Sequence, residues 1–507
     1  MDRIPRRTFV RDSVAFATVT GISQSWARDW FDSGRLDDLL ELPAVDAVAA
    51  MRSGKLTAVR YADALLARCA AGARLNAFIT LEPDRVREAA READRRRASG
   101  ARLGPLHGLP IPIKDSVNTK DYPTTGGTPA LKGFRPKADA PVVRALRDAG
   151  AIVLGKTNIH ELSFGWTSNN LAFGPVRNPY DPSRIPGGST GGTAAAVAAR
   201  MAPLGVAEDT EGSIRVPAAL CGVAGFRPTT GRYPSSGVIP ISPLFDQVGP
   251  HARSVRDLAL FDSVVANDPR PLQPASLRGV RLGVSRGYYY SGLDSEVERL
   301  ATGALEKLEA AGVVLVEGDV PEVARLVGLT TGQIQIHDVV PSLRKYLEEF
   351  GAGVTVEQVV AAASSDVKRD LEQYALPGGK YVVSEAVYRA AVETHLPALR
   401  ATFRRYFEDQ RVAAIIFPTT RIPATRIGQT EVDIKGAKVG FEAAVSRNIA
   451  PGSTAGLPGL VLPVGLTSGG LPVSVELDGP SGSDRALLDL GAAIETVLGK
   501  LPPPRLE

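Results

Sequence analysis

The stretch "RIPGGSTGGTAAAVAARMAPLGVAEDTEGSIRVP", residues 184–217, holds two serines beside glycines, Ser189 and Ser213. Glycines at 187, 188, 191 and 192 bracket the first serine, and an alanine-rich segment follows. Glycine permits backbone geometries closed to other residues, and a helix N-terminus points N–H groups at whatever precedes it. The run is too short for a flexible linker, so it predicts a shaped loop that opens a helix.

The second serine lies in a turn with several polar neighbours. Gly212 precedes Ser213, and a tight turn here would converge backbone N–H groups on one point, as an oxyanion hole requires. Asp209 and Arg215 are spaced to pair and stiffen the turn. A plain polar turn explains the same residues when they are taken alone.

A lysine ends an apolar run in "HGLPIPIKDSVNTK", residues 107–120. Lys114 follows the proline-rigid segment 109–113, which would carry its amine toward the interior. Burial disfavours the charged form of a lysine, so a neutral amine able to accept a proton becomes available. The alternative is a strand-end lysine paired with Asp115 at the surface.

Helical and strand patterns alternate along the rest of the chain. Residues 140–150 predict a helix ended by Gly150 and followed by a strand at 152–154, and residues 294–312 predict a helix capped near Asp294 or Ser295. Residues 340–412 look largely helical, whereas 413–420 and 457–466 look like buried strands. This alternation indicates an α/β fold with a mixed or parallel sheet.

Composition excludes several classes of function. The 507 residues are 44% hydrophobic and 22% charged with a net charge of +4, and the cluster Arg95–Arg97 predicts a solvated helix face, so we expect no nucleic-acid partner. No run approaches the roughly 20 apolar residues of a membrane span. The two cysteines and five histidines show no metal-ligand spacing, so we expect no metal and disfavour a His-dependent triad.

The N-terminus carries a separate signal. Arg6 and Arg7, an apolar stretch at 14–22 and small residues at 25 and 27 make residues 1–27 resemble a twin-arginine export signal. A basic terminus leading into a helix is the alternative, so localisation stays open between export to the periplasm or medium and the cytoplasm. Residues 28–100 predict a helical segment that packs on the core.

Taken together, the three segments resemble the amidase signature family. The family pattern has Lys-Asp after an apolar strand, a Gly-Gly-Ser-Ser-Gly-Gly loop and Gly-Thr-Asp-Thr-Gly-Gly-Ser-Ile-Arg-x-Pro, and this chain matches all three in order, together with "GKTNIHELSFG" at 155–165 and "AGLPGLVLPVGL" at 455–466. The resemblance implies one domain over residues 45–500 with catalytic motifs within 105–230. It also implies a central mixed β-sheet covered by helices on both faces.

The resemblance assigns roles by position. It implies Ser213 as nucleophile, Ser189 as a bridging serine on a cis peptide after Gly188, and Lys114 as terminal base. A base that removes the hydroxyl proton makes serine nucleophilic. Backbone N–H groups would form the oxyanion hole and other residues would support the serines, without any cofactor; these are Thr210, Glu211, Gly212 and Ser213 for the hole, and Gly188, Thr190, Asp209 and Arg215 for support.

Two glutamates depart from the family pattern. Glu208 replaces Thr, and Glu211 replaces the first Gly of the Gly-Gly pair. Either the turn has ordinary φ at Glu211 or strain is present, because glutamate does not adopt positive φ as cheaply as glycine. A carboxylate beside a developing oxyanion would oppose catalysis, so we expect Glu211 to point away from the nucleophile.

The substrate class is inferred from finer similarity. "HELSFGWTSNN" at 160–170 and "GPVRNP" at 174–179 are similar to the indoleacetamide and mandelamide hydrolase branch, which implies a small aryl-bearing primary amide. Phe164, Trp166 and Phe245 are candidate pocket residues. Bulkier secondary amides, anilides, carbamates or peptide amides remain alternatives, as do a tRNA-dependent amidotransferase subunit, disfavoured by Val216 where that group carries Gln, an inactive scaffold, and a homodimer.

Overall fold

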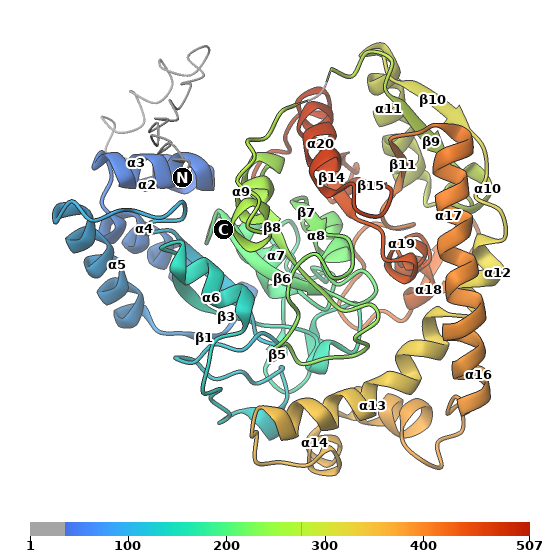
Figure 1. The fold of residues 1–507 in the computed structure, drawn as a ribbon, viewed down its shortest axis with the longest axis horizontal. Helices are drawn as coiled ribbons and strands as arrows, with labels where there is room; N and C mark the ends of the chain where they lie inside the picture. The colour runs from blue at the N-terminus through green and yellow to red at the C-terminus, as the bar shows by residue number, and fades with distance from the viewer. Residues whose placement is uncertain (1–35, 275, 507) are drawn as a thin grey trace, which may run out of the picture.

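The computed structural model describes residues 36–274 and 276–506. The predicted export signal lies outside these residues. In the described part, an eleven-stranded sheet runs in the order β1-β3-β2-β6-β8-β7-β14-β15-β11-β9-β10 (Figure 1). Its strands are β1 Phe78–Leu81, β2 Pro110–Lys114, β3 Ile152–Thr157, β6 Leu204–Asp209, β7 Ala224–Arg227, β8 Gln247–Ala252, β9 Arg281–Val284, β10 Val314–Glu317, β11 Ala414–Pro418, β14 Gly459–Leu466 and β15 Pro472–Asp478.

The sheet is mixed, as expected. Strand β2 is parallel to β3 and β6, and β9 is parallel to β10 and β11, whereas β8, β7, β14 and β15 pair antiparallel with their neighbours. Two small hairpin pairs lie apart from it: β4 Asn169–Asn170 with β5 Gly174–Pro175, and β12 Glu431–Ile434 with β13 Ala437–Gly440.

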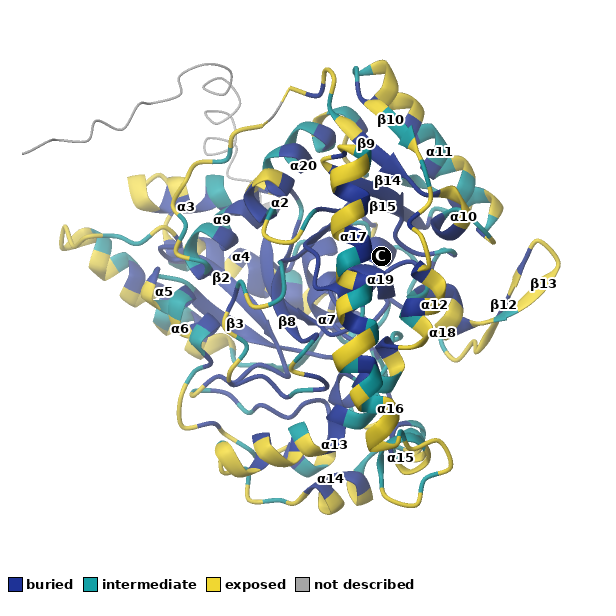
Figure 2. Cartoon of the chain, turned by 45° about the vertical axis from the view of Figure 1, so that its right-hand side comes forward, coloured by how far each residue is buried: buried dark blue, intermediate teal, exposed yellow. Residues whose placement is uncertain are grey.

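Helices surround the sheet. They are α2 Leu36–Glu41, α3 Ala44–Ser53, α4 Ala58–Ala71, α5 Pro83–Ala98, α6 Pro141–Asp148, α7 Gly191–Ala198, α8 Arg215–Cys221, α9 Val255–Val265, α10 Arg286–Tyr289, α11 Ser295–Ala310, α12 Val323–Gly328, α13 Thr331–Glu349, α14 Val356–Ala362, α15 Ser365–Asp370, α16 Glu385–Ala390, α17 Leu396–Gln410, α18 Phe441–Ser446, α19 Ala450–Ala455 and α20 Asp484–Leu498. Figure 2 shows the strands buried and the exposed residues on the outer faces of these helices.

Strand β14 shows that both faces of the sheet are covered. Successive strand residues point to opposite faces. Leu460 and Leu462 belong to the main core cluster, which includes residues of α9, α11 and α20, whereas Val461 packs with alanines of α7 and α8. The predicted helix-covered mixed sheet is therefore confirmed.

Local predictions agree with the elements observed. The helix α6 ends before Gly150, whose φ is 96°, and β3 follows. The side chain of Asp294 accepts hydrogen bonds from the first-turn N–H groups of α11, which makes it the N-cap. The segment 28–100 differs from its helical prediction in one respect, because Phe78–Leu81 forms β1 at the sheet edge. Those four residues are half-buried, a pattern that does not alternate as an exposed strand should.

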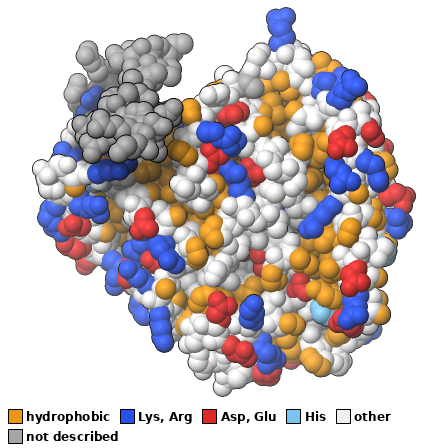
Figure 3. Space-filling view, in the orientation of Figure 1, with side chains coloured by type: hydrophobic (Ala, Val, Ile, Leu, Met, Phe, Trp, Pro, Cys, Tyr) orange, Lys and Arg blue, Asp and Glu red, His pale blue; other side chains and the backbone are white. Residues whose placement is uncertain are grey.

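The topology places the motif residues at one edge of the sheet. Because β2 and β6 are parallel neighbours with Ile113 opposite Val206, their carboxyl ends, at Lys114 and Asp209, meet. No helix among the described residues is long and apolar enough to cross a membrane. On the face drawn in Figure 3, Lys and Arg lie interspersed with Asp and Glu instead of forming one stripe.

Candidate active site

Lys114 is buried at the end of β2 and surrounded by acceptors. Its Nζ lies 2.7 Å from Ser189 Oγ, 2.7 Å from Glu208 Oε2 and 3.2 Å from the Glu208 carbonyl oxygen. Its side chain has no exposed area. The alternative of a surface pair with Asp115 is wrong, since Asp115 is also buried and lies 3.5 Å from Lys156 Nζ.

Ser189 lies in the loop that leads into α7. The Gly188–Ser189 peptide bond is cis, as the resemblance implies. The Ser189 carbonyl accepts hydrogen bonds from His160 N and Ser168 Oγ, each at 3.1 Å. A Cβ at position 188 would lie 2.7 Å from the backbone nitrogen of Thr167, so only glycine fits there.

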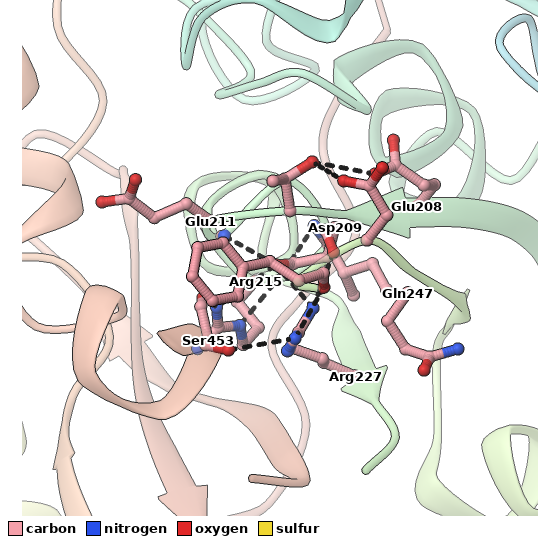
Figure 4. A network of polar contacts seen from close by, with 12 residues as sticks. Glu208, Asp209, Glu211, Arg215, Arg227, Gln247 and Ser453 are labelled. Atoms are coloured by element: carbon pink, nitrogen blue, oxygen red, sulfur yellow. Dashed lines mark hydrogen bonds and ion pairs between the residues drawn. The ribbon is translucent and has the colours of Figure 1, made fainter. Parts of the chain in front are cut away.

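The turn around Ser213 is held by a buried carboxylate. Asp209 Oδ1 accepts from Gly212 N at 2.7 Å, and Oδ2 accepts from Ile214 N at 3.0 Å and from Arg215 Nε at 3.1 Å (Figure 4). The pairing of Asp209 with Arg215 is therefore confirmed. Burial raises the pKa of Asp209, but the adjacent guanidiniums of Arg215 and Arg227 outweigh it and hold that pKa well below its usual range.

Further buried partners fix the two arginines. Arg215 Nη1 donates to Glu476 Oε1 at 2.7 Å, and Nη2 donates to the hydroxyl of Ser453. Arg227 Nη1 donates to the Asp209 carbonyl at 2.6 Å. Asp209 and both arginines are fully buried, so the turn is set by charges that have no access to water.

One expected oxyanion donor is already occupied. The N–H of Gly212 donates to Asp209, so the expectation that it faces an oxyanion is corrected. Within the described part of the chain, the N–H groups of Thr210, Glu211 and Ser213 have no such partner. Gly212 supplies the positive φ of the turn, at 94°, and Glu211 is outside the positive-φ set, which resolves the question of strain at the glutamate.

Glu208 makes contacts that sequence reasoning missed. Besides Lys114, its carboxylate accepts from Thr210 Oγ1 at 3.2 Å, and the same hydroxyl donates to Asp246 Oδ1 at 2.7 Å. Thr190, the predicted supporting residue, donates to the Glu208 carbonyl at 3.0 Å. The sequence analysis considered only the backbone N–H of Glu208. The signal available was that Lys114 and Glu208 both fall at the ends of predicted strands in the motif region.

The other glutamate turns to α13. Glu211 Oε2 accepts from Gln335 Nε2 at 2.8 Å, and its carbonyl accepts from Trp166 Nε1 at 2.8 Å. In Figure 4 its carboxylate extends away from Asp209, Arg215 and Arg227. Burial raises the pKa of Glu211 to about 7. Its orientation relative to a reacting carbonyl stays a prediction.

A cavity of about 540 Å³ opens onto Ser213. Phe164 and Trp166 line it as expected. The prediction for Phe245 is wrong, since this ring is fully buried against Ile334 and Leu396 in a separate cluster. Other lining residues are Ser163, Thr210, Glu211, Ile241, Gln335, Ile336, Arg369, Asp370, Gln373, Tyr374 and Glu442. Among the residues that the structure describes, no three His, Cys, Asp or Glu side chains gather as a metal site.

Comparison with known proteins places these features in context. The family model described as Amidase matches residues 60–488. An indoleacetamide hydrolase of Agrobacterium vitis is 40% identical over 449 residues, which are 88% of this chain and 95% of that protein. A mandelamide hydrolase of Pseudomonas putida is 38% identical, covering 92% of this chain and 94% of that protein. A crystal structure of an amidase matches with a TM-score of 0.81 and 32% identity, covering 90% of this chain and all of that one.

Proposed function

Because this chain belongs to the amidase signature family, and is therefore a hydrolase of amide C–N bonds, we propose that its substrate is a small primary amide with an aryl-bearing acyl group. The named activities of the two curated relatives support this class, since both act on such amides. The cavity supports it as well. Phe164, Trp166 and Tyr374 offer aromatic surface beside Ser213, where a ring could pack.

We propose that Ser213, Ser189 and Lys114 perform the reaction as a triad. The observation that carries this proposal is the 2.7 Å contact between Lys114 Nζ and Ser189 Oγ in a fully buried setting. A hydroxyl between nucleophile and amine can pass a proton in either direction. Within the described residues no hydrogen bond joins the hydroxyls of Ser189 and Ser213. Catalytic hydrogen bonds often tighten only when substrate binds, and we expect this one to do so.

The chemical steps follow from this arrangement. Ser213 Oγ attacks the amide carbonyl while its proton passes to Ser189 Oγ, and the Ser189 proton passes to Lys114 Nζ. The carbonyl oxygen takes the negative charge and accepts hydrogen bonds from free N–H groups of the 210–213 turn. The proton then returns through Ser189 to the leaving nitrogen, the C–N bond breaks, and ammonia departs. Water hydrolyses the ester on Ser213 by the same relay.

A substrate panel tests the proposal. Release of ammonia or amine is measured from mandelamide, phenylacetamide, indoleacetamide, glutamine, an anilide and a carbamate. The Ser213→Ala variant is measured in parallel, with Ser99→Ala, an exposed serine at the end of α5, as the matched control. We expect turnover of the arylacetamides that Ser213→Ala abolishes and Ser99→Ala retains. Turnover confined to the anilide, the carbamate or glutamine would refute the substrate class and leave the triad standing.

A further inference from the structure

The amine of Lys114 has a contact for each of its three possible hydrogens. An ammonium donates three hydrogen bonds, and the three acceptors here are Ser189 Oγ, Glu208 Oε2 and the Glu208 carbonyl. A neutral amine has two N–H donors and one lone pair. If both N–H groups point to Glu208, the lone pair faces Ser189 Oγ, which is the orientation that a proton acceptor requires.

Only one of the two acceptors on Glu208 depends on its side chain. Thr190 and Lys114 both use the backbone carbonyl, which any residue would provide. The carboxylate contact exists because position 208 is a glutamate, where the family pattern has Thr. The Glu208 side chain is 2% exposed, so its charge acts on Lys114 with little screening by solvent.

Several titratable groups surround this pair on neighbouring strands and loops. They are Asp246 before β8, His251 on β8, Asp115 after β2 and Lys156 on β3. Burial, reinforced by Glu208, raises the pKa of Asp246 to about 8, and burial lowers the pKa of His251 to about 4. Asp246 and His251 are therefore both uncharged at neutral pH. Asp115 lies beside Lys156 and so belongs to a separate pair.

We propose that Glu208 is a positioning residue whose carboxylate orients the amine of Lys114 toward Ser189 and stabilises the ammonium that forms there during acyl transfer. This inference rests on the proposed triad. No atom of Glu208 bonds to substrate, and the proton that leaves Ser213 ends on Lys114 Nζ. The negative charge that remains on Glu208 makes that transfer more favourable.

The proposal fixes the direction of a pH effect. A carboxylate beside the amine favours its charged form, so the neutral, proton-accepting form is populated only at higher pH. Glu208→Gln keeps an acceptor of similar shape and removes the charge. The acidic limb of the pH–rate profile should then move to lower pH by about one to three units. The plateau rate should fall by about tenfold, because the developing ammonium loses its counter-charge.

The test measures how fast a fluorophosphonate labels Ser213 across pH, which does not depend on knowing the natural substrate. Wild type is compared with Glu208→Gln and with Glu208→Thr, which restores the family residue and removes both charge and side-chain acceptor. We expect both variants to shift the limb to lower pH, with the lower plateau in Glu208→Thr. Asp246→Asn identifies any inflection that belongs to Asp246.

A matched control separates contact from general charge. Glu161→Gln removes another buried carboxylate, one whose Oε2 accepts from Ser364 N instead of Lys114. We expect its acidic limb to stay with wild type. An unmoved limb in folded Glu208→Gln and Glu208→Thr, or an equal shift in Glu161→Gln, would overturn the proposal. Failure of wild type to be labelled at Ser213 would instead refute the triad itself.

Discussion

Replacing Asp209 by Asn tests whether the buried charge network builds the nucleophile turn. The substitution keeps the shape of the side chain and removes the charge that faces Arg215 and Arg227 at 3.1 and 3.3 Å. Removing one partner of a buried ion pair costs about 3–5 kcal/mol. An unfolding entropy of about 2.1 cal/mol/K per residue gives roughly 1 kcal/mol/K for this chain length, so we expect the melting temperature to fall by about 3–5 °C.

The effect should depend on pH in a defined direction. The pKa of Asp209 is held far below its unfolded value of about 3.8, so the ionised carboxylate stabilises the fold above that value. This contribution is lost as the pH falls toward the folded pKa. The difference in melting temperature between wild type and Asp209→Asn should therefore be constant at neutral pH and shrink in acid.

Scanning calorimetry checks this prediction, with Asp63→Asn as the matched control. Asp63 also pairs with an arginine, at 2.8 Å from Arg87, but both side chains are exposed, so we expect no measurable change. Activity should fall in Asp209→Asn by at least about tenfold, because the donors near Ser213 lose their anchor. Equal melting temperatures for Asp209→Asn and Asp63→Asn would refute the reasoning.

Other predictions follow from the same site. Lys114→Met and Ser189→Ala should each lower kcat by about 10²–10⁴-fold in steady-state assays, since each interrupts the relay; near wild-type turnover in either would contradict the triad. Glu211→Gly should change kcat by less than about tenfold, because the carboxylate contacts Gln335; a gain of orders of magnitude would place Glu211 at the oxyanion. Glu211→Gln should gain melting temperature over wild type as the pH rises from about 4.5 to about 7, because ionising this buried carboxyl destabilises the native protein; a constant difference would argue against burial. Trp166→Phe should cost about 1 kcal/mol in denaturant unfolding through its lost hydrogen bond to the Glu211 carbonyl, and an unchanged midpoint would count against that contact.

Local signals predicted much of the fold. The cap at Asp294, the stop at Gly150 and the apolar runs of β11 and β14 are all properties of short segments. The strand β1 escaped, because its four residues are uniformly half-buried and it pairs with β3, which lies some seventy residues further along the chain. An edge pairing of this kind depends on long-range contacts that periodicity does not report.

The site divides in the same way. Position in the motifs placed Lys114 beside Ser189 and paired Asp209 with Arg215, and the structure has both contacts. Motifs did not reveal that Asp209 occupies the Gly212 N–H, since this depends on the exact path of the turn. The Glu208 contact with Lys114 also required the parallel register of β2 and β6. Phe245 failed for the opposite reason, because nearness in sequence to a motif does not bring a ring to the cavity.

The account stands on Ser213 as the nucleophile, and peptide mapping of fluorophosphonate-labelled protein tests this most directly. Folded wild type and Ser213→Ala are treated in parallel, and the modified residue is located by mass spectrometry. We predict one adduct, on Ser213, and none in the Ser213→Ala variant. An adduct on another residue, or folded wild-type protein that stays unlabelled, would contradict the account.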